Sequence, residues 1–200
     1  MTALDHAAAP ARQATIRVAS VPGSHVYVRH LGVSGDGVER LPDPASGPAA
    51  SSQASAWWPP RMLEPDWVDA NADTFDIFHV HFGFDACTPA VLEDLVSTLR
   101  DHGKPLVLTV HDLRNPHHRA RDEHDAQLDV LVPAADEVVT LTPGAAREVA
   151  RRWGRTATVV PHPHVVEPRD VRRLAERSAH RPEGPRRVGV HVKSLRACMD

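Results

Sequence analysis

The chain has 200 residues, which suits one good-sized domain or one domain with part of a second. Its formal charge of −3 divides unevenly, since residues 1–100 carry 6 basic and 12 acidic side chains and residues 101–200 carry 17 and 14. That balance argues against nucleic acid as a partner. The two cysteines are isolated, the start of the chain does not resemble a secretory leader, and no apolar run is long enough to span a bilayer. These features predict a soluble, cytoplasmic protein.

The amino-terminal part of the chain is predicted to contain one strand and a long loop. Residues 1–13 have the composition of a disordered head, and the segment "ATIRVASVP" at 14–22 predicts the first strand. Residues 32–65 are rich in Gly, Pro, Ser and Ala, so we expect a long loop there with a short strand near Val38–Leu41.

From residue 75 onward the apolar pattern alternates between strand and helix. Thr88 is the expected N-cap of the first helix, with Pro89 in its first turn and Gly103 closing it, and Thr142 and Pro143 open a later helix in the same way. The expected strands are 75–82, 104–112, 136–142 and 155–163, and the expected helices are 89–102, 121–135, 143–154 and one that begins near 167.

Strands that alternate with helices in this way predict an α/β fold with a Rossmann-like parallel sheet and helices on both faces. We expect residues 14–180 to form this domain. Residues 181–200 are expected to be a linker and the first strand of a truncated second domain, because "RVGVHVKSL" at 187–195 starts a strand pattern just before the chain stops.

Glycine, hydroxyl and imidazole groups follow the expected strands. Ligands of open parallel sheets bind outside the carboxyl ends of the strands, so these groups are predicted to line one cleft. His79 lies inside its strand, where a structural role is the favoured interpretation. The residues expected at the cleft are Gly23, Ser24 and His25 after the first strand, His81 and Gly83 after the second, His111, Asp112 and Arg114 after the third, Thr142 after the fourth and His162 after the fifth.

A zinc-dependent hydrolase is an alternative. His79 and His81 occupy one face of a strand, and His111, Asp112 or His162 offers a third ligand. No H-E-x-x-H motif or paired-cysteine frame accompanies them, so no metal is expected. The chain also lacks a G-x-S-x-G elbow, a G-x-x-x-x-G-K-[ST] loop and a clean G-x-G-x-x-G after a strand, which disfavours serine hydrolases, kinases and dinucleotide-dependent oxidoreductases.

Four segments in order resemble the amino-terminal domain of the family-4-like glycosyltransferases, which have the two-domain GT-B fold. In that family a strand ends in His-x-His, the next ends in Thr-x-His-Asp, an Ala-Asp-x-Val segment follows, and a further strand leads to Val-Pro-His. The matching segments are "FDIFHVHFG" at 75–83, "KPLVLTVHDL" at 104–113, "PAADEVVTLTPGAAREVARRWG" at 133–154 and "TATVVPHPH" at 156–164, and the resemblance covers roughly residues 14–192.

The resemblance implies that a sugar moves from a nucleotide-sugar donor to an acceptor with retention of configuration, and without a metal or a bound cofactor. His111 matches the histidine that approaches the donor sugar and is the expected catalytic residue. The other cleft residues would contact substrate, and Lys193 and Arg196 match donor-phosphate contacts by position. The chain alone is expected to be inactive, because the donor-binding carboxy-terminal domain is missing.

The loop after the first strand departs from the family pattern. A Gly-Gly pair is replaced by Gly23 and Ser24, which can still bring backbone N–H groups close to a phosphate. The nearby His25, Tyr27 and Arg29 suggest a variant contact with acceptor or phosphate.

Two further features have a functional and a structural interpretation. Trp57 and Trp58 can stack on a sugar or pack the long loop, and packing is favoured. Arg147, Arg151 and Arg152 can contact an anionic membrane surface or form a solvated helix face, and the helix face is favoured. A non-catalytic half-transferase, acting as a binding or interaction domain, is the remaining hypothesis.

Overall fold

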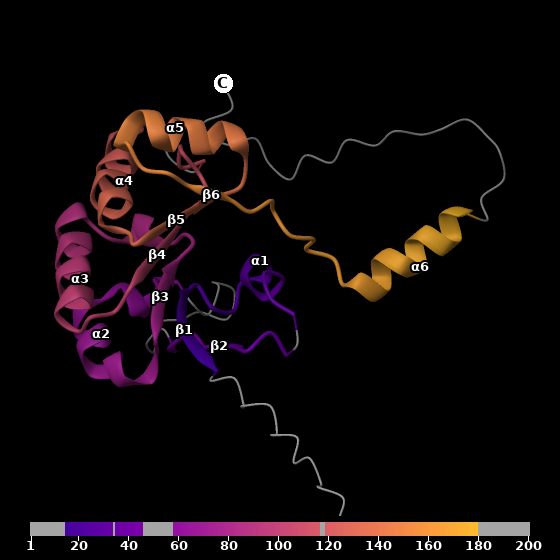
Figure 1. The fold of residues 1–200 in the computed structure, drawn as a ribbon, viewed down its shortest axis with the longest axis horizontal. Coiled ribbons are helices and arrows are strands. Elements are labelled where there is room, and N and C mark those ends of the chain that lie inside the picture. Colours follow the sequence, from indigo (N-terminus) through magenta and orange to yellow (C-terminus); the bar gives the residue numbers. More distant parts are fainter. Residues whose placement is uncertain (1–14, 34, 46–57, 117–118, 180–200) are drawn as a thin grey trace, which may run out of the picture.

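The computed structural model describes residues 15–33, 35–45, 58–116 and 119–179. It contains a six-stranded sheet in the order β2-β1-β3-β4-β5-β6, in which every neighbouring pair is parallel (Figure 1). The predicted α/β class and Rossmann-like parallel sheet are confirmed. The strands are β1 (Ile16–Val21), β2 (Val38–Arg40), β3 (Ile77–Val80), β4 (Leu106–Val110), β5 (Glu137–Thr140) and β6 (Thr158–Val159).

The helices that the capping pattern predicts begin where expected. The Thr88 hydroxyl accepts a hydrogen bond from the Val91 N–H at 3.3 Å, and the Thr142 hydroxyl accepts one from the Ala145 N–H at 3.1 Å. A proline follows each cap, where its missing N–H costs nothing. The helices are α1 (Val26–Arg29), α2 (Pro65–Asn71), α3 (Pro89–Asp101), α4 (Asp122–Ala134), α5 (Pro143–Trp153) and α6 (Pro168–Ala179).

The apolar core lies between the sheet and the helices α2, α3 and α4. Figure 1 shows these three helices on one side of the sheet and α1 on the other. Successive side chains of a strand point to opposite faces of the sheet, which explains this core. Phe78 and Val80 of β3 are fully buried against the helices, while His79 between them is only partly buried. Each fully buried side chain of this size stabilises the fold by about 1.5–3 kcal/mol.

Two helices and one strand end differ from the sequence-based expectations. The sequence does not predict α1 or α2, which are too short to form by propensity and depend on tertiary packing. In α2 the ring of Trp67 stacks on Phe75 at 6.0 Å, and Val68 is fully buried. The strand expected at 155–163 is only two residues long, because the prolines that follow cannot donate to the sheet.

The order in which successive strands are added to the sheet reverses between β1 and β3, while all strands stay parallel. The first crossover carries the chain from β1 to β2 on one side, and β3 then pairs with β1 on the other side. The loops that leave β1 and β3 therefore diverge, which creates the crevice where ligands of such sheets bind. The His81 N–H donates to the Val21 carbonyl at 2.9 Å and fixes the start of this crevice.

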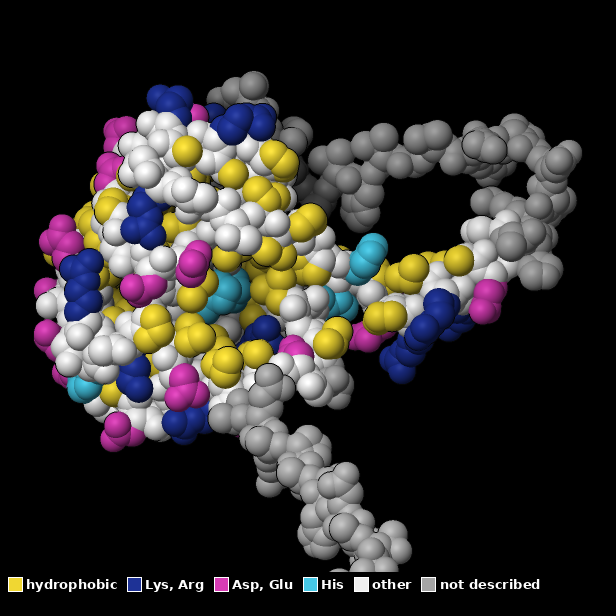
Figure 2. All heavy atoms as spheres, in the orientation of Figure 1, with side chains coloured by type: hydrophobic (Ala, Val, Ile, Leu, Met, Phe, Trp, Pro, Cys, Tyr) yellow, Lys and Arg dark blue, Asp and Glu magenta, His cyan; other side chains and the backbone are white. Residues whose placement is uncertain are grey.

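The carboxy-terminal helix α6 lies apart from the domain body (Figures 1 and 2). Its Val171 and Leu174 are exposed, and Figure 2 shows apolar side chains along one side of this helix and basic side chains along the other. No described helix is both long enough and apolar enough to cross a bilayer. The predicted head at 1–13 and the predicted second-domain strand at 187–195 lie outside the described residues.

Candidate functional site

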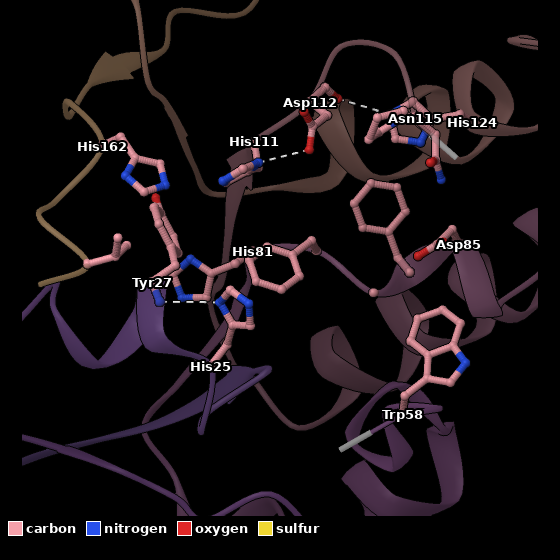
Figure 3. Close-up of a pocket in the computed structure, with 15 residues that line it drawn as sticks. His25, Tyr27, Trp58, His81, Asp85, His111, Asp112, Asn115, His124 and His162 are labelled. Carbon is pink, nitrogen blue, oxygen red and sulfur yellow. Dashed lines mark hydrogen bonds and ion pairs between the residues drawn. The ribbon is translucent and has the colours of Figure 1, made fainter. Parts of the chain in front are cut away.

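A cavity of about 750 Å³ opens beyond the carboxyl ends of β1, β3 and β4, at the point where the strand order reverses. Figure 2 shows histidine and apolar side chains at a hollow in the middle of the face drawn, and Figure 3 shows how the lining side chains point into it. Six of the residues predicted at the cleft line this cavity: His25, His81, Gly83, His111, Asp112 and His162.

His111 is held by its neighbour. Its Nδ1 lies 2.8 Å from Oδ2 of Asp112, and because an ionised carboxylate can only accept, Nδ1 carries the proton of this hydrogen bond. In the neutral imidazole, Nε2 then has the free lone pair and can accept a proton or a hydrogen bond from a substrate hydroxyl. The main chain of Asp112 is fixed in turn, because His124 Nε2 donates to its carbonyl at 2.9 Å.

The imidazole of His81 is fully enclosed by protein yet makes no hydrogen bond. It is 1% exposed, and neither ring nitrogen has a hydrogen-bond partner among the described residues. Burial, followed by the nearby His79 and Arg40, lowers the pKa of His81 well below its ordinary value. A neutral imidazole has one donor and one acceptor, and in His81 both are left unsatisfied at the wall of the cavity.

His79 fulfils the structural role that its position inside the strand suggests. Its Nε2 lies 2.9 Å from the hydroxyl of Thr109, a side-chain partner in place of the expected backbone partner. Burial lowers the pKa of His79 to about 4, with a smaller contribution from Arg40. Its ring centroid lies 3.8 Å from that of His81 with the ring planes inclined by 33°, so the two imidazoles contact each other as a neutral pair.

Tyr27 joins the histidines at this end of the cavity. Its ring lies 5.0 Å from the rings of both His111 and His162 and 5.7 Å from that of His81. His25 caps α1, since its Nδ1 accepts from the Tyr27 N–H at 3.2 Å. Burial, followed by His111 and Arg29, lowers the pKa of His25.

The turn after β1 does not line the cavity. The N–H groups of Gly23 and Ser24 donate to the carboxylate of Asp43 at 2.7 and 2.8 Å, which occupies the donors expected to approach a phosphate. A side chain at Gly23 would lie 2.8 Å from the carbonyl oxygen of Leu41, so only glycine fits beneath this loop. The carboxylate holds the loop after β2 against the turn after β1.

The remaining predicted contacts fall into two groups. Arg114 and Thr142 do not line the cavity. The guanidinium of Arg114 donates to the Arg119 carbonyl at 3.4 Å, and the hydroxyl of Thr142 caps α5. Lys193 and Arg196, predicted to face donor phosphates, lie outside the described residues.

Replacing Thr142 with alanine is expected to lower the free energy of unfolding by about 1 kcal/mol, because the Ala145 N–H loses its acceptor. Thr142→Ser keeps the hydroxyl and is expected to retain most of this stability. Urea unfolding at neutral pH measures both values, and equal stability of Thr142→Ala and the wild type would contradict the capping role.

Further residues line the cavity beyond those predicted as substrate contacts. Asn115 belongs to the loop after His111 that was expected to overhang the cleft, and Trp58 lines the cavity although packing was its favoured role. Phe84 and Asp85 also line the cavity and lie in the loop that leaves β3. The expectation that residues after the carboxyl end of a strand line the cleft, which gave His81 and Gly83, applies to them as well. His124 carries no such signal, because it belongs to the interior of the α4 pattern.

Two arginines of α5 are paired with carboxylates. Arg151 forms an exposed ion pair with Glu148, as is typical of a solvated helix face. Arg152 lies 3.1 Å from Asp125 and covers the ring of Trp153, and its side chain is only 15% exposed, so it packs against the domain.

Within the part of the chain that the structure describes, no three His, Cys, Asp or Glu side chains are placed to hold one metal ion. A catalytic zinc needs about three protein ligands, and the neighbouring His79 and His81 supply two.

Comparisons with protein-family models, curated proteins and solved structures found no match to this chain.

Proposed function

We propose that the chain is the acceptor-side domain of a GT-B glycosyltransferase, which transfers a sugar from a nucleotide-sugar donor to an acceptor with retention of configuration. The nucleotide sugar is a co-substrate, and neither a metal nor a bound cofactor takes part. A carboxy-terminal donor-binding domain is the expected partner at the edge of the sheet where the cavity opens.

The observation that carries this proposal is the placement of His111. The motif "TVHD" ends β4, and its imidazole faces a cavity at the reversal point of a parallel sheet. A second lobe that closes over this edge would bring a donor sugar against the imidazole and exclude water from it. The neighbouring "HVHF" and "VPHPH" segments contribute His81 and His162 to the same cavity, as the order of the family motifs implies.

The residues take separate roles in the proposed reaction. His111, with Nδ1 held by Asp112, hydrogen-bonds the donor sugar through Nε2 and positions it. The acceptor lies in the cavity, where Tyr27 and His81 form one wall. Basic side chains and backbone N–H groups stabilise the departing diphosphate, and this electrostatic contribution is the largest one expected.

The proposal is tested by incubating the product of the complete coding sequence with a panel of nucleotide sugars. Acceptor-dependent release of nucleoside diphosphate is expected, and chelators are expected to leave it unchanged. Binding of sugars without turnover would favour the non-catalytic binding domain. Stoichiometric metal in protein purified without added metal would favour the zinc-dependent hydrolase.

A further inference from the structure

We infer that the acceptor carries an amino group, and that its ammonium binds at the acidic end of the cavity, beside Asp85 and the ring of Trp58. The inference rests on the proposed acceptor role of the cavity. It names an amine-bearing sugar or polyol as the substrate class and excludes a phosphorylated one.

The two ends of the cavity differ in chemistry. Figure 3 shows His25, Tyr27, His81 and His162 gathered at one end, and Asp85 and Trp58 at the other. We call the second the acidic end. Asp112 lies between the two, and its backbone and side chain are fixed by the histidines described above.

The charge of the lining favours a cation. The described residues that line the cavity include two carboxylates, Asp85 and Asp112, and no lysine or arginine. Two arginines act electrostatically on the other end of the cavity. Arg29 contributes to the lowered pKa of His25, and Arg40 contributes to the lowered pKa of His81. An ammonium at the acidic end therefore meets the carboxylate of Asp85, and the second carboxylate, Asp112, lines the same cavity, whereas a phosphate at this end is repelled by Asp85.

Aromatic faces strengthen the same preference. Figure 3 shows Trp58 at the same end of the cavity as Asp85, and Phe84, which also lines the cavity, precedes Asp85 in the chain. Aromatic faces attract cations through their quadrupole and pack against the CH groups of a sugar ring. Because Phe84 also stacks on His124 with an interplanar angle of 14°, its ring is held in place before a ligand arrives.

The unpartnered imidazole of His81 indicates independently that the cavity receives a polar ligand. A ring that is 1% exposed and makes no hydrogen bond carries a desolvation cost that a bound hydroxyl group would relieve, since a hydroxyl can both donate and accept. Burial keeps this imidazole neutral by lowering its pKa, so it does not repel an ammonium elsewhere on the same molecule. The ligand then has hydroxyl groups at the imidazole end and an ammonium group at the acidic end.

The inference is tested with three sugars of one size and different charge. Dissociation constants of D-glucosamine, D-glucose and D-glucose 6-phosphate are measured for the full 200-residue chain by saturation-transfer NMR. We expect glucosamine to bind roughly 10-fold more tightly than glucose, and glucose 6-phosphate to bind most weakly. Asp85→Asn is expected to remove the preference for glucosamine, while Asp94→Asn, which removes an exposed carboxylate on α3, is expected to keep it.

The outcomes separate this inference from the proposed function. Equal binding of glucosamine and glucose at the cavity, or preference for the phosphate, would overturn the amine and leave the acceptor cavity standing. Failure of all three sugars to bind would overturn both. If Asp85→Asn does not fold, the ranking of the three sugars by the wild-type chain still decides the matter.

Discussion

Replacing His111 with alanine is expected to lower the turnover number of the proposed transferase by roughly 10²-fold, because the donor sugar loses the hydrogen bond that positions it for reaction. The variant removes the only contact to the Oδ2 atom of Asp112 that the structure records for the described residues, and it also removes the Nε2 lone pair directed at the cavity. The fold is expected to survive, because the His111 side chain is 24% exposed and lies outside the apolar core.

A matched variant separates chemistry from general damage. His102 caps the end of α3, is paired with Asp69 at 2.7 Å and does not line the cavity. His102→Ala is expected to leave the turnover number within about twofold of the wild type, since a surface ion pair of this kind contributes about 0–1 kcal/mol. The turnover numbers of both variants are measured as nucleoside diphosphate release at saturating donor, and an unchanged rate for His111→Ala would contradict its catalytic role.

The fold is expected to lose stability steeply in mild acid because it buries neutral histidines. The folded-state pKa of His79 is about 4 and its ordinary value is 6.5, so the unfolded chain binds the proton first as the pH falls. The stability is fully present above pH 6.5 and is lost as the pH falls from there towards 4. The difference corresponds to a loss on the order of 3 kcal/mol for His79, and the lowered pKa of His81 adds to it.

Urea unfolding between about pH 7 and 4.5 measures this loss, above the range where most carboxylates titrate. His79→Gln keeps a hydrogen-bonding group opposite Thr109 but cannot titrate, so the variant is expected to show a flatter pH dependence. A wild-type free energy of unfolding that does not change over this range would show that the histidines are protonated without cost.

The sheet and the larger helices could be predicted because local pattern and tertiary burial agree there. The unbroken apolar run of β4 is buried on both sides, and α3 has a threonine cap, a proline in the first turn and a glycine after its end. The order of strands along the chain then places His81 and His111 at one edge of a parallel sheet, since every strand points the same way.

Other parts of the site depend on contacts that a single sequence does not reveal. Asp43 lies 20 residues beyond Gly23, and no local rule indicates that its carboxylate would occupy the donors of that turn. His124 lines the cavity from a helix whose other buried residues include Leu128 and Leu131 of the apolar core. The depth at which His81 is buried is set by Tyr27 and the short helix α1, which form only when the rest of the domain has packed.

The proposed function requires that sugars bind in the cavity beyond β1, β3 and β4, where the strand order of the sheet reverses. The most direct measurement records the histidine ring signals of the ¹⁵N-labelled chain by NMR during titration with D-glucosamine and, separately, D-glucose. We predict that the signals of His81 and His111 shift with a common saturation curve while those of His102 stay in place. Sugar-induced shifts at His102, or rings of His81 and His111 that do not respond to either sugar, would contradict the account.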